Sequence, residues 1–489
     1  MRRGALSALL LLCVLPSRAN AHTRLLRSTP AAGVTISAAP LELRLVFSEA
    51  PELAYTSIVL RASDGAVVTL SPPAIAAGTV ATVVCGIRGE IRSGRYTVEW
   101  QAGGADGHPV KGRYTFTVSS VGAAPVAPVA ETQQPKARSV PDTSADHHDP
   151  ALMPQAANAG TFGSESPLYA AVRWLQFVGL LVVIGAAAFG KIVLGAMPQF
   201  HPADAGLVRT ARARASRVGL WGVAIVACSA VLRLVAQSYA IHGSIDAVTN
   251  AGISVMLRET SWGAGWLLQI AGAAIAGWGF FIAARRSGDS ASLTTFAQHE
   301  RARMRGWSIA ACAAIVLAFT PGLASHAASA PRLSVFAMIA DGLHVLGAGG
   351  WVGGLTALVL AGIPAAWALP GNDRGPAVAA LVNAFSPTAL VFAGIVATTG
   401  VFAAWLHVGS LDALRMTMYG RLLLTKLAVV SLLAGAGAYN WRRVKPQLGS
   451  EVAAQRIRRS ASAEILFGVI VLVVTAVLVA TPAAADMQM

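Results

Sequence analysis

Residues 41–47 read Leu41-Glu42-Leu43-Arg44-Leu45-Val46-Phe47, in which apolar and polar side chains largely alternate. Successive side chains of a β-strand point to opposite faces, so this alternation predicts a strand with one face in a hydrophobic core. Residues 57–61, 96–100 and 113–118 repeat the pattern, with turn residues between them and no helical periodicity. Residues 22–118 are therefore predicted to form an all-β sandwich or barrel.

The residues before this β-region have the composition of a secretory signal peptide. Arg2 and Arg3 precede an apolar run, and small residues stand at Ala19 and Ala21. Cleavage after Ala21 removes residues 1–21 and gives His22 a free α-amine beside its own imidazole. The unperturbed pKa of an α-amine is about 8, so a metal can displace its proton near neutral pH. His22 is therefore a candidate metal ligand; the alternative is that it merely follows the cleaved bond.

The overall composition predicts a membrane protein. Of the 489 residues, 55% are hydrophobic and only 12% are charged, whereas soluble domains carry about 25% charged residues. The net charge of +15 is compatible with nucleic-acid binding. However, the arginines cluster in short segments between apolar runs, and no zinc-finger or aromatic RNA-binding signature accompanies them. We therefore expect a lipid bilayer, and no nucleic acid, as the partner.

Residues 119–166 form a predicted flexible linker, because they are rich in proline, alanine and polar residues and show no periodicity. The region 167–485 behind it is predicted to be a polytopic α-helical membrane domain with eight transmembrane helices. Each helix corresponds to an apolar run of about 20 residues or more, which is the length that crosses a bilayer. The runs lie near 168–197, 216–240, 261–284, 307–325, 334–365, 378–406, 419–440 and 461–482.

Three connections between the runs are rich in arginine and lysine, and they alternate with poorer ones. Such residues collect on the cytoplasmic side of a membrane. These connections are therefore expected on the cytoplasmic side of the cell inner (plasma) membrane. Both mature termini and the β-region are then expected outside, in the periplasm, which agrees with the signal peptide. The basic residues are Arg209, Arg212, Arg214 and Arg217; Arg285, Arg286, Arg301, Arg303 and Arg305; and Arg442, Arg443, Lys445, Arg456, Arg458 and Arg459.

The β-region contains a second candidate ligand pair in Asp106 and His108. On an extended segment these residues, at i and i+2, point to the same side; the alternative is a solvated turn. With His22 they form a nitrogen- and oxygen-rich set that suits tetragonal Cu(II). Methionine is absent between 22 and 118, and Cys85 is the only cysteine there. Neither a thioether site for Cu(I) nor an internal disulfide is therefore expected.

The start of the mature chain, His22-Thr-Arg-Leu-Leu-Arg-Ser-Thr-Pro-Ala-Ala-Gly33, resembles the opening of CopC-type periplasmic copper-binding domains. The resemblance continues through 45–49, 94–100 and 106–108. It implies a Greek-key sandwich of the immunoglobulin or cupredoxin kind, with His22, Asp106 and His108 as Cu(II) ligands. Glu49 falls where the family often has an acidic residue, so a supporting role in orienting a ligand is expected.

The membrane region resembles the CopD-type copper-resistance membrane domain, chiefly along 342–354, Gly-Leu-His-Val-Leu-Gly-Ala-Gly-Gly-Trp-Val-Gly-Gly. An ionisable residue deep in a membrane helix is a functional candidate by default, which singles out His344. His326 and His407 stand at predicted outer helix ends. All three histidines are candidate metal sites along a membrane path, or else ordinary core and interfacial residues. The glycines of this stretch are expected to be packing features.

Together these features predict a fusion of a CopC-type and a CopD-type domain that handles copper. The exported domain captures Cu(II) and passes copper to the membrane domain for import, with a role in copper resistance or homeostasis. Other exported copper proteins are possible partners, and no enzymatic activity is expected. Two alternatives stay open: a haem-binding membrane electron carrier with histidine axial ligands, and a periplasmic copper buffer whose helices are only an anchor.

Overall fold

The computed structural model describes residues 24–103, 109–119, 166–197, 202–242, 252–285, 293–323, 334–408, 410–447 and 450–481. They form two compact units, one built from β-strands and one from helices. Each unit is described by itself below.

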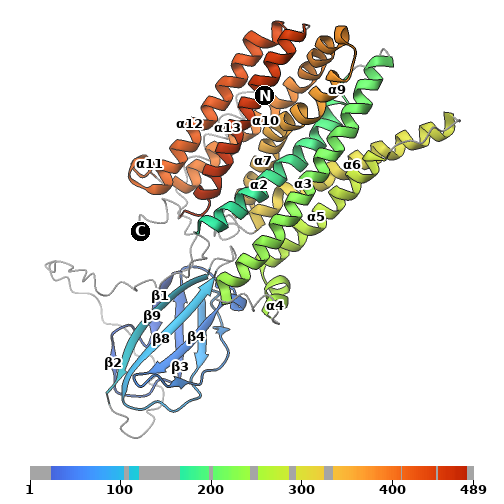
Figure 1. Ribbon diagram of the computed structural model, residues 1–489. Coiled ribbons are helices and arrows are strands. Elements are labelled where there is room, and N and C mark those ends of the chain that lie inside the picture. The colour runs from blue at the N-terminus through green and yellow to red at the C-terminus, as the bar shows by residue number, and fades with distance from the viewer. Residues whose placement is uncertain are drawn as a thin grey trace, which may run out of the picture. The chain divides into compact units, whose positions relative to one another are not determined.

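The β-unit is a sandwich of two sheets (Figure 1). One sheet has the order β1-β3-β7-β6 and the other β2-β9-β8-β4-β5. Among the described strands, only β2 and β9 pair in parallel. Neighbouring strands are often distant in sequence, as in Greek-key connections. The strands are β1 (Leu25–Thr29), β2 (Thr35–Ile36), β3 (Glu42–Phe47), β4 (Ser57–Ala62), β5 (Val67–Val68), β6 (Ala74–Ile75), β7 (Thr82–Gly86), β8 (Gly94–Gly103) and β9 (Pro109–Val118).

The core of the sandwich comes from the predicted alternation. In β3, the side chains of Leu43, Leu45 and Phe47 are buried, while the residues between them are more exposed. Phe47 packs edge-on against Trp100 of β8, with ring centroids 5.5 Å apart. The predicted all-β sandwich is therefore confirmed, and all four predicted strands are present as β3, β4, β8 and β9.

Cys85 lies in this core and makes no disulfide. Burial raises the pKa of its thiol to about 11. Because the thiolate is the form that ligates metals, the thiol of Cys85 is a poor metal ligand at neutral pH.

The helical unit contains eight helices that are long and apolar enough to cross a bilayer, within the described ranges. They confirm the predicted number. Each span overlaps one predicted run, but the spans Asp204–Tyr239, Ala297–Leu323 and Val452–Leu478 begin well before the predicted 216, 307 and 461. The elements are α2 (Pro167–Ala188), η3 (Phe189–Val193), α3 (Pro202–His242), α4 (Gly252–Glu259), α5 (Ser261–Ala284), α6 (Leu293–Leu323), α7 (Ser334–Ala348), η6 (Gly349–Gly353), α8 (Gly354–Ala357), η7 (Leu358–Gly362), α9 (Ile363–Trp367), α10 (Gly371–Val408), α11 (Ala413–Met416), α12 (Met418–Tyr439), η8 (Asn440–Val444), η9 (Lys445–Gln447) and α13 (Glu451–Leu478).

Many of the basic residues expected in connecting loops lie inside helices. Arg209 to Arg217 belong to α3, and Arg301 to Arg305 belong to α6. The physical reason is that both helices continue beyond their apolar stretches, and charged residues cover the extra turns. Glu300 forms ion pairs with Arg212 and Arg303, each with an N–O distance of 3.6 Å, so two of these cations also have a structural role.

The glycine-rich part of the fifth span is a packing element, as expected. It forms a π-helical turn, η6, that contacts α2. A Cβ atom added to Gly353 would overlap the carbonyl oxygen of Leu181, and one added to Gly185 would overlap the backbone of Gly353. The two helices therefore touch through their backbones, an approach that small residues permit in membrane proteins.

We expect Gly353→Ala to destabilise the helical unit, because α2 and η6 must separate to accept the new methyl group. Overpacking of this kind costs about 1–3 kcal/mol or more. Gly394→Ala on α10 is the matched control, since a Cβ there has nothing within 4 Å and alanine favours helix by about 1 kcal/mol. Thermal unfolding of the full chain in detergent measures both variants; equal melting temperatures would contradict the close approach.

Candidate functional site

Three predicted ligands of the β-unit, His22, Asp106 and His108, lie outside the described residues, as does His326 of the membrane unit. Glu49 is described and is half-buried, in the connection that follows β3. Near the predicted copper ligands, the structure therefore describes only Glu49 and residues close to them in the sequence.

The connection after β3 bridges two parts of the chain. At one end, the Arg24 N–H donates to Ser48 Oγ at 2.9 Å and the Ser48 N–H donates to the Arg24 carbonyl at 2.8 Å. At the other, the Glu52 N–H donates to the carbonyl of Gly103, the last residue of β8, at 2.8 Å. Glu49 lies between these anchor points. The start of β1, the end of β8 and Glu49 thus gather at one end of the sandwich.

In the membrane unit, His344 of α7 is held by a residue of α10. Its Nδ1 atom lies 2.9 Å from Oγ1 of Thr399. The Thr399 hydroxyl also lies 2.7 Å from the carbonyl of Ile395, to which it donates its proton. A hydroxyl has one proton to give, so Thr399 accepts from the Nδ1–H of His344. The Nε2 atom then carries the lone pair, which is the form of imidazole that binds a metal.

Two further ionisable residues lie near His344. Asp341 precedes it by three residues on α7, one helical turn away. Lys426 of α12 is within electrostatic range of both Asp341 and His344. Asp341 and Lys426 thus both lie near His344 within the helical unit.

His407 lies near the end of α10, away from His344. Its Nδ1 donates to the carbonyl of Ala403 at 2.8 Å, and its ring stacks on Tyr419 at 6.3 Å between centroids. Eight residues separate it from Thr399, or about 12 Å along the helix axis. His344 and His407 therefore lie at different levels of the bundle. This arrangement differs from that of the two axial ligands of one haem, which lie on opposite sides of a single iron.

Glu464 is buried on α13. The Asn440 side-chain amide donates to its carboxylate. The reason is the packing of α12 against α13, which encloses the carboxylate and makes a hydrogen-bond donor on the facing helix necessary.

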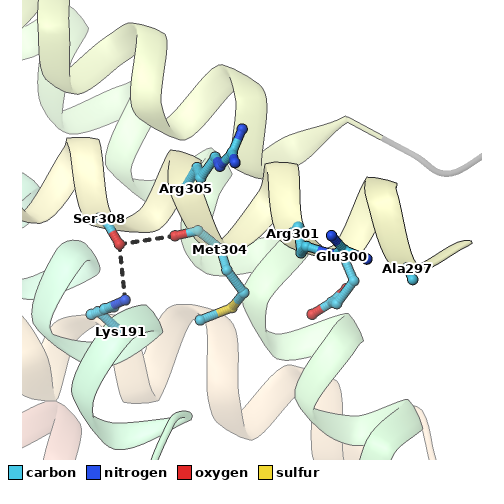
Figure 2. A pocket seen from close by; sticks show the side chains of 7 residues that line it. All are labelled: Lys191, Ala297, Glu300, Arg301, Met304, Arg305 and Ser308. Carbon is cyan, nitrogen blue, oxygen red and sulfur yellow. Dashed lines mark hydrogen bonds between the residues drawn. The ribbon is translucent and has the colours of Figure 1, made fainter. Parts of the chain in front are cut away.

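A pocket opens at the end of the bundle where α2 ends and α6 begins (Figure 2). The Lys191 ammonium donates to Ser308 Oγ at 2.9 Å, and Met304 lies between Lys191 and the arginines. Its lining residues are Lys191, Ala297, Glu300, Arg301, Met304, Arg305 and Ser308. This lining is mainly cationic, with no imidazole and with Glu300 as its one carboxylate, so it does not suit copper. Within the described ranges, no group of three or more His, Cys, Asp or Glu side chains could hold a metal ion.

Comparison with known families covers most of the chain. The CopC domain model matches residues 25–119, the model of the Copper resistance protein D-like N-terminal domain matches 164–334, and the Copper resistance protein D model matches 379–478. With the fold, these matches define a multi-pass membrane protein that carries an N-terminal β-sheet domain. The chain belongs to the copper resistance and transport family, as a fusion of a CopC domain with CopD-type membrane domains.

Two relatives and one solved structure are similar to nearly all or part of the chain. The Copper transport protein CutJ of Bacillus subtilis is 26% identical over 97% of this chain and 76% of its own length. The Copper resistance protein D of Pseudomonas syringae pv. tomato is 28% identical over 63% of this chain and 94% of its own. The crystal structure of PcoC, a methionine-rich copper resistance protein from Escherichia coli, is 31% identical over 20% of this chain and 99% of that one, with a TM-score of 0.19.

Two residues near His344, Asp341 and Thr399, were not predicted from the sequence. Asp341 could have been found, because it is an acidic residue in an apolar run one turn before a candidate histidine. Thr399 could not, because threonine is common in membrane helices and the contact spans 55 positions.

We expect Thr399→Val to release His344 from its single tautomer, because valine keeps the shape but cannot accept a hydrogen bond. ¹⁵N NMR of histidine-labelled protein measures this, with His344→Gln identifying the signal. Thr398→Val is the matched control, since Thr398 is exposed and bonds only within its own helix. A tautomer that is unchanged in Thr399→Val would contradict the assigned hydrogen bond.

Proposed function

We propose that this protein captures Cu(II) on its exported β-domain and passes copper to the eight-helix domain for import across the cell inner membrane. It would thereby contribute to copper resistance and homeostasis. The observation that carries the proposal is the meeting of Arg24, Glu49 and Gly103 at one end of the β-unit. The similarity of nearly the whole chain to a protein named for copper transport supports it.

The reach of the chain supports one site formed by the predicted ligands. A residue spans at most about 3.6 Å. His22 is two residues before Arg24, so it lies within about 7 Å of it; Asp106 is three residues after Gly103, within about 11 Å. Both anchor points belong to the connection that carries Glu49. Asp106 and His108 can therefore meet His22 at this end of the sandwich.

The donor set suits Cu(II) in particular. The α-amine and imidazole of His22, the imidazole of His108 and the carboxylate of Asp106 offer nitrogen and oxygen in the numbers that a tetragonal site needs. Glu49 can accept a hydrogen bond from a ligating imidazole and so fix its orientation. The amine exists only after cleavage at Ala21, so signal removal completes the site.

The orientation of the chain follows from its charges. Lys191, Arg212, Glu300 and Ser308 join the end of α2 and the starts of α3 and α6 at one basic end of the bundle. The positive-inside tendency supports a cytoplasmic position for this end. The start of α2, and with it the β-domain, is then outside.

We expect one residue inserted between Ala21 and His22 to weaken Cu(II) binding by about 100-fold or more, which corresponds to about 3 kcal/mol. The insertion converts the His22 amine to an amide while it leaves every side chain in place. Copper titration of the mature protein, with electron paramagnetic resonance to report the ligand nitrogens, measures the effect. A matched insertion in the linker after Pro135 should bind like the native chain. Equal affinities of the two insertions would refute the N-terminal ligand.

Within the membrane, His407 and His344 are proposed as successive sites. On this topology His407 lies nearer the outside, and His344 lies about 12 Å deeper. The lone pair on His344 Nε2 makes it a ligand without loss of its bond to Thr399. Asp341 supplies a negative charge that favours a cation at this depth.

We expect His344→Ala to lower cellular copper accumulation to the level of a deletion strain, whereas a protein that only buffers copper outside the membrane would be unaffected. Thr398→Val, exposed on the same bundle, should accumulate copper normally. Copper content per cell, at equal amounts of protein in the membrane, is the measurement. A rise in copper in the deletion strain would overturn import in favour of export or sequestration.

A further inference from the structure

Two arginines are buried in the helical unit, at the end opposite to the basic one. Arg173 of α2 is 8% exposed and Arg233 of α3 is 9% exposed. They lie near the start of α2 and towards the end of α3, and they are close enough to repel one another. Two buried like charges are costly unless something compensates them.

The described residues offer these guanidinium groups no carboxylate. Arg173 donates to the backbone carbonyl of Ala476 at 3.3 Å, and Arg233 donates to Oε1 of Gln269 at 3.1 Å. Each also stacks on an aromatic ring, Arg173 on Tyr169 at 4.9 Å and Arg233 on Trp262 at 5.6 Å. None of the ion pairs among the described residues includes either arginine.

Gln269 of α5 adds a further donor without a partner. Its Oε1 atom accepts from Arg233 and, at 3.1 Å, from Nε2 of Gln176. Its own Nε2 is buried with no hydrogen-bond partner among the described residues, and the side chain is 1% exposed. A guanidinium has five N–H donors, so donors exceed acceptors at this place. A buried surplus of donors and positive charge is what an anion satisfies.

We propose that Arg173, Arg233 and Gln269 bind a small inorganic anion between α2, α3 and α5. Contacts from four helices surround the pair, because Arg173 also reaches Ala476 of α13. Both arginine residues are more than nine-tenths buried, which places them inside the bundle rather than on its lipid-facing rim. A halide or an anion of similar size therefore fits better than a lipid headgroup.

The test is the anion dependence of stability of the full chain in phosphatidylcholine nanodiscs. Chloride replaces gluconate at constant ionic strength, and thermal melting is followed. The native chain should show a saturating rise in melting temperature with chloride, as expected for a ligand that binds the folded state. Arg173→Gln and Arg233→Gln should lose this dependence. Arg258→Gln should keep it, because Arg258 is exposed on α4.

A second measurement does not depend on variants that fold. In crystals of the native chain grown with bromide, an anomalous peak should lie within hydrogen-bond reach of Arg173 and Arg233. Absence of that peak, or the same chloride dependence in Arg173→Gln as in the native chain, overturns the proposal. Stabilisation by phosphatidylglycerol but not by chloride also overturns it, in favour of a lipid. Neither readout involves copper, so the result is independent of the transport proposal.

Discussion

The close approach of α2 to η6 is the constraint on which the membrane unit depends. In a bilayer, apolar surfaces gain little by leaving lipid, so helices associate mainly through tight packing and polar contacts. Gly185 and Gly353 let two backbones touch. The fifth span has a π-helical turn, η6, at this contact. The turn shifts the register of the residues before it relative to those after it. His344 stands just before that turn, so the contact that holds the bundle together also fixes the direction of the candidate metal-binding helix.

The two ends of the helical unit differ in how their charged side chains are partnered. At the end with α2's C-terminus, cations share Glu300 or bond to Ser308. At the other end, Arg173 and Arg233 rest on aromatic rings, amides and a carbonyl. Between them, Lys426 is matched with Asp341, and Glu464 with Asn440. Lys191, Arg212 and Glu464 thus each have a polar or charged partner on another helix, whereas the arginine pair has no carboxylate partner among the described residues.

The sequence predicts what depends on local pattern. The alternation in 41–47 gives β3 and its buried face, because side-chain direction in a strand is fixed by the backbone. The apolar runs give the eight spans, because bilayer thickness sets their length. The bond between His344 and Thr399 and the burial of Glu464 depend on which helices become neighbours, which no local pattern encodes. The Cu(II) ligands His22, Asp106 and His108 stay a prediction.

The buried thiol of Cys85 has a consequence for where this domain can work. Copper ions and thiolates exchange electrons readily, so an accessible thiol would be oxidised as it reduced Cu(II). The β-domain encloses its only sulfur atom in a core of strands and keeps it protonated. Its fold also needs no oxidative cross-link. The domain therefore has no accessible sulfur atom to react when the redox state of its surroundings changes, a property that suits the proposed capture of a redox-active metal outside the cytoplasm.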